Sequence, residues 1–174
     1  KLSKVQNFKA AFYGCSKLAT LGHLDFSCGT DFTQTFYGCS SLRDLNGAAT
    51  WNLSNAITVE QMFYGCSGLK SLQGADGWQL LKATNFSQMF YGCSGLTTLA
   101  GSENWKIQSA TDFSQLFYGC TALTNVDAAY GWDVSKVTTF AQAFYNCSSL
   151  ASVSGLGGWN TSSATTLTDM FYGC

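Results

Sequence analysis

The chain has 174 residues, of which 46% are hydrophobic, so it is long enough and apolar enough to bury a core. Nine basic and ten acidic residues give a net charge of −1, which excludes the strong positive field that nucleic-acid binding needs. No apolar run approaches the roughly 20 residues of a membrane span, and residues 1–11 lack the apolar stretch of a signal peptide. We therefore predict no nucleic-acid partner and no membrane span in this segment.

An internal repeat organises the whole sequence. The motif Phe-Tyr-Gly-Cys, with Asn in place of Gly in one copy, begins at Phe12, Phe36, Phe63, Phe90, Phe117, Phe144 and Phe171. The copies are 24 residues apart once and then 27 residues apart five times, which indicates a repeat protein. We predict one domain, residues 1–174, made of a partial coil (1–11), coils 12–35, 36–62, 63–89, 90–116, 117–143 and 144–170, and a partial coil (171–174). Since neither end carries a polar capping unit, we expect a segment of a longer protein.

The first predicted element of each coil is a short strand. Three residues after the Cys, and again three residues later, an apolar side chain recurs, as at Leu69 and Leu72. This spacing is typical of a strand that is buried on one side. Further along the coil, one column holds Leu24 and then every Trp of the chain, Trp51, Trp78, Trp105, Trp132 and Trp159. A column of large rings predicts a stacked layer in the core.

The second predicted element is a two-turn helix. A column of N-cap residue types is followed three positions later by Gln34, Gln61, Gln88, Gln115 and Gln142, which is the capping-box spacing. Apolar side chains at Phe86, Met89 and Phe90 give one buried face, and Gly92 stands where a helix ends in a left-handed residue. The Gln column is also compatible with a ladder of amides, but the capping box is the preferred interpretation.

These elements predict an α/β solenoid of the leucine-rich-repeat type. Its parallel β-sheet is expected on one face, with one short helix in each coil of about 27 residues. Stacking equal coils about 4.8 Å apart pairs the strands and brings equivalent residues above one another.

The repeat resembles the BspA-like leucine-rich repeat family of cell-surface proteins. The residues that match its pattern are Trp132, Ser135, Val137, Thr138, Phe144, Cys147, Ser148, Ser149, Leu150 and Val153. The resemblance covers all 174 residues, although Phe replaces the first Met of the pattern in most coils and the loop before Trp is longer than in many members. It implies a surface-exposed, ligand-binding or adhesive solenoid, located extracellularly or on the cell surface, that forms part of a larger anchored protein.

The cysteines do not have the spacing of a metal site. Seven of the eight share one column, with no C-x-x-C pair, and we predict a ladder of buried free thiols in preference to disulfides. Cys28 lies outside that column and is predicted to be an exposed, reactive thiol.

Catalytic machinery is not evident, so we predict a protein that is not an enzyme and needs neither cofactor nor metal. His23 is the only histidine and falls in the shortened loop of an irregular coil, and the acidic residues are scattered over several columns. The Tyr that precedes each Gly-Cys is interpreted as packing, with an exposed aromatic stripe that grips sugars or a partner as the alternative.

The predicted binding face is the outward side of the strands, where short polar side chains vary from coil to coil. The predicted binding residues, from two adjacent rows, are Thr20, Asp44, Asn46, Ser71, Gln73, Thr98, Asn125, Asp127, Ser152 and Ser154. Such rows suit contact with a protein or glycan ligand, so the first hypothesis is a recognition or adhesion module. The alternatives are a solvated surface without a ligand, end-to-end self-association into filaments, and ice binding through the column Thr30, Thr84, Thr111, Thr138 and Thr165.

Overall fold

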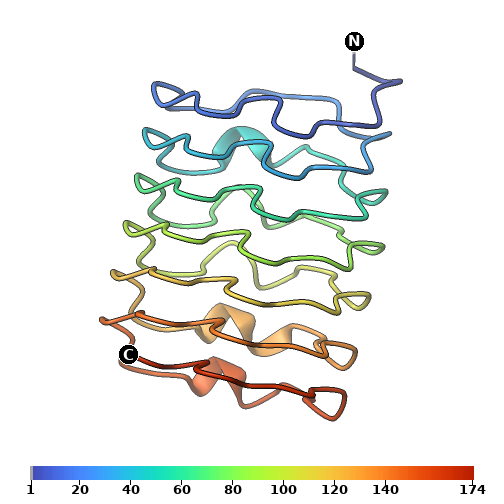
Figure 1. Ribbon diagram of the computed structural model, residues 1–174. Helices are drawn as coiled ribbons and strands as arrows, with labels where there is room; N and C mark the ends of the chain where they lie inside the picture. The colour runs from blue at the N-terminus through green and yellow to red at the C-terminus, as the bar shows by residue number, and fades with distance from the viewer. Residues whose placement is uncertain (1) are drawn as a thin grey trace.

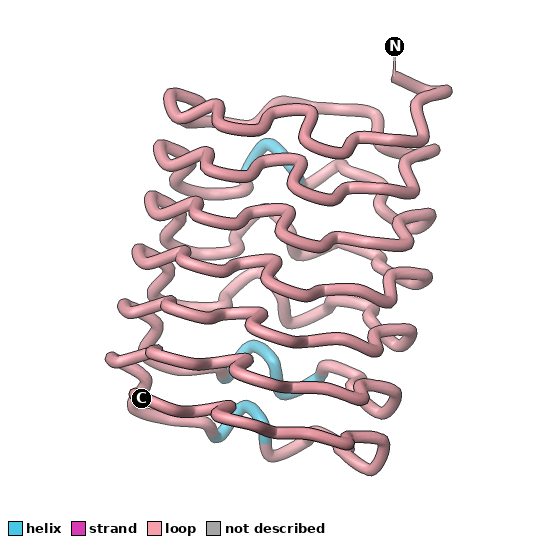
Figure 2. Tube along the Cα trace, viewed as in Figure 1, coloured by secondary structure: helices cyan, strands magenta, loops and turns pink. Residues whose placement is uncertain are grey.

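The computed structural model describes residues 2–174. Successive turns of the chain are stacked along one axis, and the N- and C-termini lie at opposite ends of the stack (Figure 1). Three short 3₁₀ helices are present within these residues, η1 (Asn46–Ala48), η2 (Asp127–Gly131) and η3 (Ser154–Leu156). The rest of the tube is drawn as turns and loops (Figure 2). Hydrogen bonds between coils therefore hold the stack together, in place of long helices or strands.

Parallel β-bridges join equivalent residues of successive coils. One continuous series runs through the column that the sequence assigned to helix N-caps, from Asn7 and Asp31 to Thr58, Asn85, Asp112, Thr139 and Thr166. The side of the coils that carries the apolar pairs of the predicted strand, such as Leu69 and Leu72, is called the Leu-x-x-Leu side, and fewer β-bridges join its coils. It has one isolated bridge, between Asn125 and Ser152, and single backbone bonds such as that from Lys70 N–H to the Arg43 carbonyl at 3.0 Å. Within residues 2–174, this side forms bridges and single bonds where the sequence predicted a continuous sheet.

The predicted two-turn helix in each coil is wrong, because this segment is a run of consecutive turns. In one coil, Met62 N–H bonds to the Val59 carbonyl at 3.1 Å and Tyr64 N–H bonds to the Gln61 carbonyl at 3.1 Å. The alternate N–H groups point out of the coil: Gln61 N–H reaches the Ser87 carbonyl of the next coil at 3.0 Å, and Phe63 N–H reaches the Met89 carbonyl at 2.9 Å. Gln61 has a φ of 54°, which an α-helix does not allow but the third residue of a type II turn requires.

The distance between coils explains why turns replace the helix. Equivalent rings in this segment lie 5.4–5.6 Å apart from Phe36 to Phe144, whereas packed α-helices need about 8–10 Å between axes. A helix in every coil would separate the remaining columns. Consecutive turns keep the spacing of a sheet and still bury positions i, i+3, i+4 and i+7, as at Val59, Met62, Phe63 and Cys66.

The core consists of stacked columns, as the sequence predicted for the tryptophans. Neighbouring Trp rings have centroids 5.5–6.3 Å apart and planes within 14° of parallel. Each indole N–H also donates to a backbone carbonyl of the preceding coil, as from Trp105 to Ala75 at 2.9 Å. The Trp column therefore combines apolar burial with a hydrogen bond that fixes the register of one coil on the next.

Candidate functional site

The predicted binding residues occupy the surface on the Leu-x-x-Leu side of the coils. Thr20, Asn46, Gln73, Asp127, Ser152 and Ser154 are exposed, and Asp44, Ser71, Thr98 and Asn125 are half-buried. The inward neighbours of these residues, such as Leu72 and Val126, are fully buried. The face is therefore built on a rigid core, and its side chains reach solvent without disturbing that core.

The predicted binding face has two rows. The first row is Thr20, Asp44, Ser71, Thr98, Asn125 and Ser152, and the second row is Asn46, Gln73, Ala100, Asp127 and Ser154. Side chains of the first row accept hydrogen bonds from the backbone of the second row. The Asp44 carboxylate accepts the Asn46 N–H at 3.0 Å, and the Asn125 amide oxygen accepts the Asp127 N–H at 3.3 Å. The Thr98 hydroxyl oxygen does the same for Ala100, and that of Ser152 for Ser154. Since these oxygens cap the turn two residues ahead, the first row shapes the loop, and the side chains of the second row are not used in these caps.

The second row begins the three 3₁₀ helices, whose first residues are Asn46, Asp127 and Ser154. Between η2 and η3 the surface is hollowed over a volume of about 310 Å³, lined by Asp127, Tyr130, Ser154 and Gly155. The Ser154 hydroxyl donates to the Asp127 carboxylate at 2.8 Å, although the two residues are 27 positions apart. The structure thus brings two of the predicted binding residues together in one hollow.

Tyr130 is a residue of this hollow that the sequence prediction missed. Its side chain is 65% exposed, and its ring atoms lie about 3.5 Å from where a Cβ of Gly158 would stand. It is the one Tyr outside the Tyr-Gly-Cys motif, in a column that otherwise holds Ala49, Asp76, Glu103 and Gly157. That departure from the repeat is the signal that could have identified it.

The Gln column is an amide ladder, so the capping-box interpretation is wrong. Gln34 donates to Gln61 and Gln115 donates to Gln142, each at 2.6 Å, and Gln61, Gln88 and Gln115 are joined by equivalent bonds. The side chains are half-buried. The three inner amides have a partner on the coil above and below, and the two end amides, Gln34 and Gln142, have one each. The ladder therefore ties coils together and offers few free groups to a ligand.

The Tyr column forms a continuous stack whose members hide one another's faces. From Tyr13 to Tyr172, the ring centroids are 4.5–4.9 Å apart and the planes lie within 18° of parallel. Burial, followed by the neighbouring rings of Tyr91 and Tyr37, raises the pKa of Tyr64 to about 12. Since only the ring edges of the inner members face outward, packing explains this column better than an aromatic stripe that stacks on sugars.

The thiols are free, and most of the Cys column is buried as predicted. Cys39, Cys66, Cys93, Cys120 and Cys147 are buried, while Cys15, Cys174 and Cys28 are exposed. A buried thiol such as Cys93 donates to a backbone carbonyl, that of Phe63, at 3.2 Å. Burial raises the pKa of the Cys93 and Cys120 thiols well above the ordinary value, so both stay protonated and unreactive near neutral pH.

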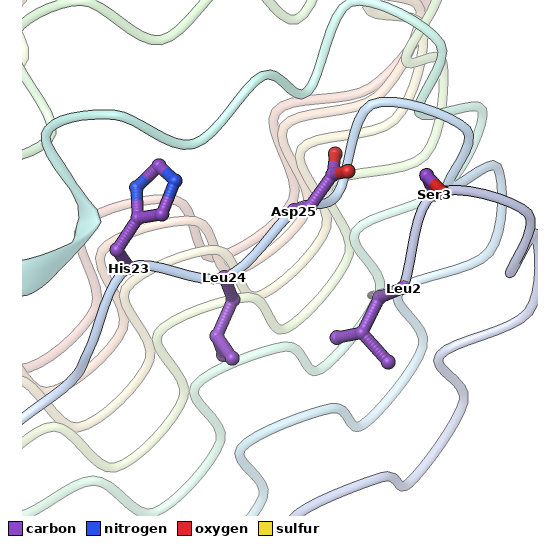
Figure 3. Close-up of a pocket in the computed structure, with 5 residues that line it drawn as sticks. All are labelled: Leu2, Ser3, His23, Leu24 and Asp25. Atoms are coloured by element: carbon purple, nitrogen blue, oxygen red, sulfur yellow. The ribbon is translucent and has the colours of Figure 1, made fainter.

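A second hollow, of about 540 Å³, lies beside the first coil and is lined by Leu2, Ser3, His23, Leu24 and Asp25 (Figure 3). His23 and Asp25 extend to one side of the backbone and Leu24 extends to the other (Figure 3). The His23 imidazole is hydrogen-bonded to the Thr50 hydroxyl. Hydrogen bonds from Ser27, first from its hydroxyl and then from its N–H, lower the pKa of Asp25. The side chains of His23 and Asp25 are thus both paired with a Ser or Thr of the surrounding loops.

The Thr column proposed for ice binding is interrupted, because Ile57 occupies its second position and is 53% exposed. The hydroxyls of Thr111, Thr138 and Thr165 donate to backbone carbonyls of the preceding coil at 2.9–3.2 Å. These hydroxyl protons therefore point into the stack.

Two kinds of feature are absent from residues 2–174. No helix in this range has the length and apolar character that crossing a bilayer requires. The same residues contain no group of three or more His, Cys, Asp or Glu side chains arranged to hold a metal ion.

Comparison with known proteins identifies one family. The model of the family described as "Mycoplasma protein of unknown function, DUF285" matches residues 1–102 and again residues 93–174, so the two matches together cover the whole chain. No curated protein and no solved structure matches the chain significantly. With its whole length covered by two successive matches, the chain belongs to the DUF285 family, which is related to the BspA-like repeat surface proteins.

Proposed function

We propose that the chain is a leucine-rich-repeat-type solenoid that works as a recognition or adhesion module on the cell surface. Its binding face is the second row, Asn46, Gln73, Ala100, Asp127 and Ser154, together with the residues that shape it. The partner is a host or matrix protein or a glycan. Relationship to the BspA-like surface proteins supports this location.

One observation carries the proposal: inward columns repeat the same residue type, whereas the second row changes in every coil. The Trp column, which is buried except for the half-buried Trp159 at its end, repeats one residue five times. The second row instead presents Asn, Gln, Ala, Asp and Ser in succession, and four of its five side chains are exposed. A repeated core that displays varied surface groups suits recognition along an extended surface.

A binding function also fits the chemistry of the side chains better than catalysis. The hydroxyls of Ser67, Ser94 and Ser148, which follow the buried Cys, are exposed, and the one histidine lies in a different loop. Nucleophilic catalysis needs a base within hydrogen-bonding distance of the nucleophile. We therefore propose a protein without catalytic activity.

Arrays of glycans and matrix proteins test this function. The wild-type chain is compared with a face variant that replaces Asn46, Gln73, Asp127 and Ser154 by Ala. A control variant replaces the four exposed hydroxyl residues Ser67, Ser94, Thr121 and Ser148 by Ala. We expect the face variant to lose at least about 10-fold in affinity and the control to bind like the wild type.

Equal binding by the face variant and the wild type would reject the proposed face, and a chain that binds nothing on either array would contradict the recognition function.

Sedimentation over a concentration series separates the module from the filament alternative. A module keeps one sedimentation coefficient, whereas a filament grows with concentration.

A further inference from the structure

We infer that the hollow between η2 and η3 is a subsite for one neutral hexopyranose residue of a glycan. The inference rests on the proposed function and names the class of ligand that the binding face takes. The hollow is shallow and has a volume of about 310 Å³, so it suits one sugar ring that lies on the surface and not a deeply buried ligand.

Tyr130 supplies the apolar surface that a sugar ring requires. The C–H face of a hexopyranose is weakly positive and packs on the negative face of an aromatic ring. The inner rings of the Tyr column have both faces covered by neighbours 4.5–4.9 Å away, but Tyr130 stands apart from that column and is 65% exposed. Gly158 of the next coil lies beside the ring, since a Cβ there would be in ordinary van der Waals contact with it at about 3.5 Å.

Asp127 and Ser154 supply the polar side of the subsite. Ser154 donates its hydroxyl proton to Oδ1 of Asp127 at 2.8 Å, while the Asn125 side chain accepts the Asp127 N–H. The Ser154 bond orients the carboxylate and leaves Oδ2 to accept hydrogen bonds from sugar hydroxyls, while the Asn125 bond fixes the backbone of Asp127. A charge-assisted bond of this kind is roughly twice as strong as a neutral one.

Gly155 keeps the floor of the hollow open. A Cβ at this position would lie 1.9 Å from the Val126 carbonyl oxygen and 2.7 Å from Cα of Asp127. A larger residue would therefore push η3 away from η2 and separate Ser154 from Asp127. Glycine here is required by the close approach of two backbones, since its φ lies outside the left-handed region.

The charge around the hollow selects a neutral sugar over an acidic one. Glu103 and Asp76 occupy the position of Tyr130 in the two preceding coils, and the loops from 73–78 to 154–159 on this edge contain no Lys or Arg. A carboxylate on the ligand would meet Asp127 and this acidic edge at once. Like charges so placed weaken binding, so sialic acids are expected to be rejected.

Titration of the isotope-labelled 174-residue chain, followed by amide NMR spectra, tests the subsite. The ligands are free galactose, glucose, mannose and N-acetylglucosamine, with N-acetylneuraminic acid as the acidic comparison and arginine as the cationic one. We expect at least one neutral sugar to give saturable shifts at Asp127, Tyr130, Ser154 and Gly155, with a Kd on the order of 1 mM. N-acetylneuraminic acid should leave these signals unchanged, and arginine, which is attracted by the carboxylate alone, should bind no more tightly than the neutral sugar.

Three variants and two controls identify the residues involved. Tyr130→Ala and Asp127→Asn should each weaken the sugar by at least about 5-fold, and Ser154→Ala by less, since it only orients the carboxylate. Ile57→Ala and Asp169→Asn remove an exposed apolar group and an exposed charge elsewhere and should bind like the wild type. Unchanged thermal unfolding shows that the variants remain folded.

The subsite is overturned if no neutral sugar shifts these signals, if Tyr130→Ala binds as well as the wild type, or if only arginine or the acidic sugar binds. The two proposals fail separately. Array binding through the face without any sugar shifts overturns the subsite alone. Sugar shifts combined with array binding that ignores the face variant overturn the proposed face alone.

Discussion

Single residues in this chain differ in reactivity according to their position in the stack. The thiols of Cys66, Cys93 and Cys120 lie in the core, where burial raises each pKa well above the ordinary value. Cys28 lies on the surface in a column that otherwise carries Asn, Lys and Ser. One residue type therefore serves as a small apolar filler in one column and as a solvent-accessible thiol in another.

Thiol labelling measures this difference. At neutral pH, iodoacetamide is expected to modify Cys28 within the native state, together with the exposed Cys15 and Cys174. Cys66, Cys93 and Cys120 should react only after denaturant is added, because neither water nor reagent reaches them. Peptide mass mapping over time records each site. Equal rates at Cys28 and Cys93 would contradict the buried column.

Alkaline pH is expected to destabilise the stack. Burial raises the pKa of Cys39 to about 11, and burial with the neighbouring tyrosines raises that of Tyr64 to about 12. In the unfolded chain these groups lose their protons near pH 9 and 10. The folded state retains protons that the unfolded state has released, so this stability is complete below about pH 9 and is lost as pH rises towards 12.

Circular dichroism melting curves from pH 7 to 12 test the pH dependence, with absorbance at 295 nm to follow tyrosinate. We expect Tm to fall steadily above about pH 9 and part of the tyrosines to titrate only as the chain unfolds. A constant Tm up to pH 12, with all tyrosines titrating near pH 10, would be inconsistent with the buried ladders.

Among the elements, the run of consecutive turns shows where sequence patterns are ambiguous. The apolar spacing i, i+3, i+4 fits an amphipathic helix and fits these turns equally well, because both bury Val59, Met62 and Phe63 on one side. Gln three positions after an N-cap residue likewise fits both a capping box and an amide ladder. The distance to the neighbouring coil decides between them, and that distance is a property of the assembled stack, which no single repeat encodes.

Breaking the amide ladder tests the role of this element. Gln88→Ala removes the side-chain bonds to Gln61 and Gln115 while keeping a non-glycine residue at a φ of 57°. We expect a loss of about 1–3 kcal/mol in the free energy of unfolding, measured by urea denaturation. Gln73→Ala, which replaces an exposed Gln outside the ladder, should change stability by less than about 0.5 kcal/mol. Similar values for both variants would remove the ladder as a source of stability.

For the whole molecule, the sequence predicted the columns well and the surface less completely. The Trp and Cys columns were visible because a 27-residue period repeats them. The sequence predicted the hollow between η2 and η3 only in part. Asp127 and Ser154 were predicted as binding residues, whereas Tyr130, which departs from the repeat, was not. A site created by departures from a repeat has no period to reveal it, and its shape depends on how two neighbouring loops pack.

Removing one whole coil tests whether the molecule is an array of equal units. Deletion of residues 90–116 joins two coils in register, so the shortened chain should fold and should unfold with a urea m-value smaller by about one sixth. Deletion of residues 90–109 removes part of a coil and breaks every column. If both shortened chains unfold cooperatively, or if neither does, the claim that the molecule is an array of equal units is contradicted.

The central claim is that equivalent residues of successive coils lie directly above one another. The five indole N–H groups provide separate NMR signals, and the Trp ring centroids are 5.5–6.3 Å apart. A NOESY spectrum of the aromatic region is expected to show an unbroken series of contacts from Trp51 through Trp78, Trp105 and Trp132 to Trp159. A spectrum in which these rings have no contacts with one another would contradict the stack.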